Sequence, residues 1–192
     1  MFKSGIEKLL EENMTERGFK LWKAIDQRLP NIWEKPTSST GKYHKKLNGK
    51  VPTIAEHVYE MLYAATKLVQ MFDIKIKTTK ADTIFLAIVL HDALKYGPFG
   101  SRLHTDVRHD KEVADKIVHE NRQTFAKFFT NEQVQLLEDM LRYHSGRWST
   151  DVVSSKFSFE NLPPEVLFLH MLDMMSTHDL IQTDMREEFQ TI

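Results

Sequence analysis

Cysteine is absent from this chain of 192 residues, and glycine and proline are sparse, with seven and six copies. Disulfides and thiolate metal sites are therefore excluded, so any metal would be held by imidazole and carboxylate groups. No apolar run approaches the ~20 residues that cross a membrane, and the N-terminus is too charged for a signal peptide. We expect a protein that stays out of the membrane and works in the cytoplasm.

A charge excess is missing too. The 26 Lys and Arg residues nearly balance the 27 Asp and Glu residues, which leaves a formal net charge of -1. This balance argues against a protein that coats long nucleic acid through bulk electrostatics, and a small-molecule partner fits better. The length suits one domain over residues 1–192, since no composition break divides it. The oligomeric state stays open.

Apolar residues recur at helical spacing along most of the chain, and no strand pattern or internal repeat is visible. The sequence therefore predicts an all-α fold, a compact array of roughly six to eight helices around a central site. Residues 1–30 form an N-terminal helical segment in this prediction. Four residue pairs have the spacing of a helix-starting capping box: Ser4 with Glu7, Thr53 with Glu56, Thr79 with Asp82, and Thr130 with Gln133.

Residues 31–52 are different, because turn-forming residues and five lysines replace the hydrophobic periodicity. A loop of this length is uncommon in a compact domain unless it is functional or disordered. Two interpretations stay open for it. It is either a solvated basic loop, or a loop near the site in which Lys42, Tyr43 and His44 fold over an anionic substrate.

The stretch from Ile84 to Gly97, I-F-L-A-I-V-L-H-D-A-L-K-Y-G, carries polar residues into an apolar helix. We expect this helix to run to Lys95 or Tyr96. Burying an unpaired charge costs several kcal/mol, so His91 and Asp92 need a metal, a counter-charge or a hydrogen-bond network to receive them. Asp92 and Lys95 lie three residues apart and share a helix face.

Other potential ligands occur on apolar helices elsewhere in the chain. His57 lies in the first turn of one predicted helix, His144 ends another, and Asp173 stands between Leu172 and Met174. A lone histidine on such a helix is usually a core residue. Antiparallel helices can nevertheless turn side chains from several helices toward one cavity, which favours a shared site.

The order of His57, His91-Asp92 and Asp173 resembles the H…HD…D signature of the HD-domain superfamily of metal-dependent phosphohydrolases, and Lys95 fits its H-D-x-x-K variant. The resemblance covers residues 42–179. Six segments are similar to a branch of small bacterial and phage HD-domain proteins: S-T-G-K-Y-H, E-H-V, L-H-D-A-L-K-Y-G, R-H-D-K-E-V-A, Y-H-S-G-R-W-S-T-D and L-D-M-M-S. The cell would then be a bacterium or a phage-infected host.

The resemblance implies two divalent transition metals, drawn from Mn, Fe, Co, Ni or Zn. The ligands of the first would be His57, His91, Asp92 and Asp173. His109 and His144 would hold the second, with Asp92 as the bridge. His119 competes with His109, and His104 is a third option. His170 is either a partner behind the ligands or a buried hydrogen-bonded residue, and we expect no role for His178-Asp179.

By the same resemblance, a metal-activated water would cleave a phosphoester of a nucleotide, with Asp92 and Lys95 as the catalytic residues. On charge alone, Lys95 would contact a non-bridging phosphate oxygen or the leaving group. Lys42 and Arg147 would hold a further phosphate. Tyr43 or Trp148 would stack on a base. A nucleoside monophosphate, a nucleoside triphosphate, a cyclic nucleotide and a short oligonucleotide all remain possible substrates. Two other functions also stay open: an HD-type di-iron oxygenase, and a non-catalytic nucleotide-binding sponge.

Overall fold

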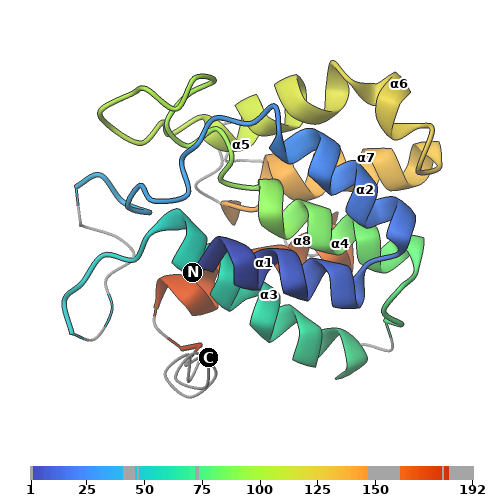
Figure 1. Ribbon diagram of the computed structural model, residues 1–192, viewed down its shortest axis with the longest axis horizontal. Coiled ribbons are helices and arrows are strands. Elements are labelled where there is room, and N and C mark those ends of the chain that lie inside the picture. The colour runs from blue at the N-terminus through green and yellow to red at the C-terminus, as the bar shows by residue number, and fades with distance from the viewer. Residues whose placement is uncertain are drawn as a thin grey trace.

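The computed structural model describes residues 2–40, 46, 48–71, 74–146, 161–178 and 180–181. These residues form eight α-helices, one π-helical segment and no named strand, which confirms the all-α prediction (Figure 1). The helices in chain order are α1 (Phe2–Asn13), α2 (Glu16–Asp26), α3 (Ile54–Met71), α4 (Thr79–Leu90), α5 (His109–Val113), η1 (Ala114–His119), α6 (Arg122–Phe125), α7 (Asn131–Tyr143) and α8 (Pro164–Thr177).

The central helix of the fold is α4. Every residue from Ala81 to Leu90 is buried, as expected of a helix that is apolar on all sides. It contacts α1, α2, α3, α7 and α8, and Figure 1 shows it in the middle of the array with α2 on one side and α1 and α3 on the other. The C-terminal end of α4 therefore lies in the interior of the protein rather than in solvent.

The end of α4 differs from the prediction. The helix stops at Leu90, and residues 91–96 form tight turns in which the backbone N–H of Ala93 donates to Leu90 and that of Lys95 donates to Asp92. These bonds reach three residues back instead of four, so the chain tightens and leaves the helical path. Gly97 follows with φ 78, a conformation that favours glycine.

Helix starts follow the predicted capping pairs only in part. Thr130 and Gln133 form a complete capping box at α7, which confirms that prediction. Thr53 accepts a bond from the N–H of Glu56 at the start of α3. The Ser4 prediction is wrong, because α1 already begins at Phe2. The prediction for Thr79 is wrong by one residue, since the hydroxyl of Thr78 caps α4.

The described part of the predicted loop packs back on the fold. Thr37 N donates to Pro52 O and Ile54 N donates to Lys35 O, around an isolated bridge between Pro36 and Thr53. Lys42, Tyr43 and His44 lie outside the described residues. Among the helices that the structure does describe, none has the length and apolar character needed to cross a membrane.

Candidate metal centre

Four predicted ligands meet at the buried end of α4. His91 caps this helix and Asp92 follows it, while His57 comes from the first turn of α3 and His144 from the end of α7. Their exposed fractions are between 0% and 1%. His109, the first residue of α5, lies against the same cluster.

Three of the histidine rings are held by their own backbone. His91 Nδ1 lies 2.7 Å from the carbonyl oxygen of Ile88, and the Nδ1 atoms of His109 and His144 contact the carbonyls of Asp106 and Leu141 at the same distance. A carbonyl oxygen can only accept, so each Nδ1 carries the proton. In the neutral form of such a ring, the Nε2 atom is left with a lone pair.

These Nε2 atoms point at other nitrogens rather than at donors. His109 Nε2 lies 3.2 Å from His144 Nε2, and His91 Nε2 lies 3.2 Å from His57 Nε2. The proton position on His57 is not fixed by a backbone carbonyl. The Nε2 lone pairs of His109 and His144, however, repel at this distance and cannot form a hydrogen bond. A cation between them would satisfy both, and neutral imidazole suits Mn, Fe, Co, Ni and Zn. The residues therefore fit the divalent metals that the sequence predicts.

Asp92 connects the two pairs. Its Oδ1 atom is 3.1 Å from His109 Nε2, yet this buried oxygen has no aligned hydrogen-bond donor among the described residues. Two groups of mutually close ligand atoms result: His57, His91 and Asp92 form one, and Asp92, His109 and His144 form the other. Asp92 belongs to both groups, so its carboxylate is the point at which the two groups meet.

The protonation states suit metal binding. Burial lowers the pKa of His144 to about 3, and the neighbouring His91 and His109 add to this effect. Burial also lowers the pKa of His91. Burial opposes the ionisation of Asp92, but the neighbouring groups, Lys95 first among them, hold the pKa of this carboxyl well below its usual range. Ligands must be deprotonated to bind a metal, and these groups already are.

Lys95 lies beside the shared carboxylate. Its Nζ donates to Asp92 Oδ2 over 2.6 Å, and the two side chains are almost completely buried. The spacing of three residues predicted a common face. In the structure the tight turns after α4 bring the two groups together instead, because this segment is no longer helical.

Asp173 stands at the edge of the cluster. Its Oδ1 atom lies 3.2 Å from His57 Nε2, and its side chain, on α8, is 17% exposed. It is not a member of either group of mutually close ligand atoms. The structure thus places Asp173 where it can complete the set around His57, on the side closer to solvent.

The alternative histidines lie elsewhere. His119 Nδ1 is 3.6 Å from Glu138 Oε1 and its side chain is 64% exposed, and His104 is exposed as well. His170 Nδ1 contacts the backbone carbonyl of His144 at 2.7 Å, so it supports the chain behind a predicted ligand. His178 is exposed, and Asp179 lies outside the described residues.

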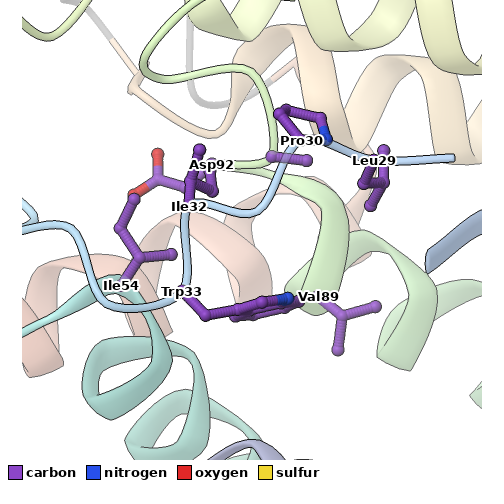
Figure 2. Close-up of a pocket in the computed structure, with 8 residues that line it drawn as sticks. Leu29, Pro30, Ile32, Trp33, Ile54, Val89 and Asp92 are labelled. Carbon is purple, nitrogen blue, oxygen red and sulfur yellow. The ribbon is translucent and has the colours of Figure 1, made fainter. Parts of the chain in front are cut away.

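An apolar wall covers one side of Asp92. Figure 2 shows the segment after α2, with Pro30, Ile32 and Trp33, passing beside this carboxylate. The small cavity between them has a volume of about 10 Å³, and Asp92 is the single charged residue among the eight that line it. This is about the room that one water molecule needs. The wall therefore shields this side of Asp92 from bulk water.

Three of the predicted substrate residues from the loop, and Arg147 and Trp148, lie outside the described residues. The sequence analysis missed Glu60 and Ser176, which lie directly behind His57. A signal existed for both, since Glu60 follows His57 by three residues and Ser176 follows Asp173 by three. Residues at this spacing share a helix face.

The model of the HD domain family matches residues 54–181. This range begins at α3, ends beyond α8 and contains every predicted metal ligand. The chain therefore belongs to the HD-domain superfamily, and this superfamily consists generally of metal-dependent phosphohydrolases. Neither a search of the curated proteins nor a search of the solved structures found a match.

Proposed function

We propose that this protein hydrolyses a phosphoester of a nucleotide in a metal-dependent reaction. The substrate is a nucleoside monophosphate, a nucleoside triphosphate or a cyclic nucleotide. The observation that carries the proposal is the arrangement of two Nε2 pairs, each 3.2 Å apart, around the carboxylate of Asp92. Membership of the HD superfamily supports the reaction class.

In this proposal the ligands fall into two sets that share Asp92. The first set contains His57, His91, Asp92 and Asp173, and the second contains Asp92, His109 and His144. Bound divalent cations supply Lewis acidity and lower the pKa of a coordinated water. The chain favours the neutral imidazoles of His91 and His144 and the ionised carboxylate of Asp92, so these three ligands have no proton to lose before the cations bind.

Lys95 provides the positive charge of the site. Its Nζ is fixed 2.6 Å from Asp92 Oδ2 in a buried position, so it would meet a phosphate oxygen without reorganisation. A preorganised donor in a dry site stabilises developing charge far better than the same donor in water. Lys42, Tyr43, His44, Arg147 and Trp148 are proposed to bind the rest of the nucleotide.

The test is a screen of the purified protein with Mn, Co, Ni, Mg and Zn. The compounds are ribonucleotides, deoxynucleotides and cyclic dinucleotides, and the products are identified by mass spectrometry. We expect release of phosphate or a nucleotide product with at least one metal, and its loss in Asp92→Asn. No turnover with any metal would contradict the proposal.

The same preparation separates the alternatives. Oxygen uptake by an iron-loaded sample would indicate the di-iron oxygenase. Retention of an intact nucleotide without product would indicate the sponge. A hydrolase of nucleotides would act on the cytoplasmic pool, and the proposal keeps the cytoplasm of a bacterial or phage-infected cell as its place of action.

A further inference from the structure

His57 differs from the other three clustered histidines in the group behind its ring. His91, His109 and His144 each contact a carbonyl three residues earlier in their own segment. His57 Nδ1 instead lies 2.9 Å from the hydroxyl oxygen of Ser176, 119 residues away on α8. A hydroxyl can donate or accept, so this contact alone does not determine which nitrogen of His57 carries the proton.

The next group in the chain of contacts removes this ambiguity. Ser176 Oγ donates to Glu60 Oε2 over 2.8 Å, and Ser176 and Glu60 are only 3% and 4% exposed. An ionised carboxylate can only accept, so it takes the single hydroxyl proton of Ser176. Ser176 Oγ must then accept from His57, which places the ring proton on Nδ1 and leaves a lone pair on Nε2.

We propose that Ser176 and Glu60 are positioning residues that fix the tautomer and the orientation of His57 for metal binding. They do for His57 what a backbone carbonyl does for each of the other three histidines. The inference rests on the metal-binding part of the proposed function and not on the identity of the substrate.

Lys46, from the loop of residues 31–52, extends this chain of contacts. We call the chain from His57 through Ser176 and Glu60 to Lys46 the relay. Lys46 forms an ion pair with Glu60 Oε1, and the exposed fractions of these two side chains are 12% and 5%. Burial raises the pKa of Glu60, and the bonds from Lys46 and Ser176 oppose this rise. A buried carboxylate without a partner is costly, so Lys46 supplies the charge that keeps Glu60 an acceptor. The relay thereby links residues 31–52 to the ligand on α3.

The first test needs no substitution. In the metal-free wild-type protein, long-range nitrogen–proton NMR of ¹⁵N-labelled histidine reports which ring nitrogen of His57 is protonated. We expect a protonated Nδ1 and an unprotonated Nε2. The opposite tautomer would overturn the inference, and this reading holds whether or not the protein turns over any substrate.

Two variants test the consequence for metal binding. Ser176→Ala removes the acceptor, and Glu60→Gln introduces an amide that can donate to Ser176 and so permits the other tautomer. We expect the affinity for Mn²⁺, measured by calorimetry, to fall about 10–100-fold in each, the usual effect of losing a partner behind a ligand. Glu60→Gln should also show a mixture of His57 tautomers.

Glu56→Gln is the matched control. Glu56 lies on the same helix and pairs with another loop lysine, Lys50, at 3.5 Å. We expect this variant to bind Mn²⁺ like the wild type. Wild-type affinity in both Ser176→Ala and Glu60→Gln would overturn the inference while leaving the proposed function intact. A wild-type protein that binds no divalent metal would contradict the proposed function instead. The NMR measurement would then still show whether Ser176 and Glu60 fix the tautomer of His57.

Discussion

Hydrogen bonds behind the rings organise the metal centre at the scale of single residues. The proton on each Nδ1 is held by a carbonyl at 2.7 Å for His91, His109 and His144. The lone pairs then converge on one region in which Asp92 is the shared anion. Outer partners of this kind fix ring orientation and raise ligand basicity. The site is therefore preorganised by the fold before any cation binds.

The choice between His109 and His119 gives a sharp test at this scale. His109 lies 3.1 Å from Asp92 Oδ1, whereas His119 is exposed beside Glu138. We expect His109→Ala to lose one of two bound metals after dialysis, measured by elemental analysis, because the second group loses a ligand. His119→Ala is the control and should keep both. Loss of a metal in His119→Ala alone would contradict the assignment.

Lys95 is predicted to act on the reaction more than on metal binding. The substitution Lys95→Met removes the ammonium group that lies 2.6 Å from Asp92 Oδ2. It leaves all six proposed ligands in place. We expect kcat for phosphoester hydrolysis to fall about 100-fold or more, as when one preorganised donor is lost. Lys111→Met, which removes a surface ion pair with Asp115, should have little effect. An unchanged kcat in Lys95→Met would refute this role.

At the scale of elements, the junction between α2 and α4 shows how a helix terminus is fixed by a distant residue. Thr15 caps α2, and its N–H and hydroxyl donate to Asp82 on α4 at 2.8 and 2.5 Å. Gly18 donates its N–H to Thr15 Oγ1. A Cβ atom on Gly18 would lie 2.4 Å from Asp82 Cγ, so the close approach of the two helices requires glycine here.

This junction leads to a stability prediction that reverses the usual helix rule. Alanine normally stabilises a helix relative to glycine by roughly 1 kcal/mol. We expect Gly18→Ala to lower the free energy of unfolding by about 1–3 kcal/mol. The new methyl group would collide with the Asp82 carboxylate, which its hydrogen bonds to Thr15 keep in place. Urea denaturation measures the change. In the Asp82→Ala background the same substitution should cost clearly less, and equal costs would exclude the clash as the cause.

Local sequence signals predicted some helix ends well and others poorly. Thr130 and Gln133 were sufficient for α7, because a capping box involves only backbone groups three residues away. Asp82 was expected to help start α4, but in the structure its carboxylate accepts hydrogen bonds from the N–H and the hydroxyl of Thr15. The early end of α4 at Leu90 had no local breaker, since Gly97 lies seven residues beyond it.

At the scale of the whole molecule, the candidate centre joins elements from most of the chain. Its residues come from α3, the end of α4, α5, the end of α7 and α8. A cation held by all of them would crosslink the helical array in the folded state. Ligands that bind only the folded state stabilise it according to their concentration relative to Kd.

Metal removal should therefore lower the thermal stability. At a free metal concentration of about 100 times Kd the stabilisation is about 2.7 kcal/mol. This corresponds to a shift in Tm of about 5–10 °C for a domain of this size. We expect chelation to lower Tm by this amount, measured by calorimetry, and added metal to restore it. The Tm of Asp92→Asn should not change when the chelator is added. An unchanged Tm of the wild type after chelation would contradict a contribution of the metal to stability.

The sequence by itself determined the helical class, the burial of the stretch around His91 and Asp92, and membership of the HD superfamily. The helical class and the burial of this stretch are local features, because periodicity involves neighbours along the chain. Membership of the superfamily rests on residues spread from His57 to Asp173. The types of ligand were also readable, since the lack of cysteine leaves imidazole and carboxylate.

Only the tertiary structure decided which residues meet. The contacts between His57 and His91, between His109 and His144, and between His57 and Ser176 join residues 34, 35 and 119 positions apart. Their geometry depends on how the helices pack and on the turns after Leu90, neither of which is encoded in a short segment. The resemblance already predicted Asp92 as the shared carboxylate, whereas the position of Ser176 and Glu60 behind His57 appears only in the folded molecule.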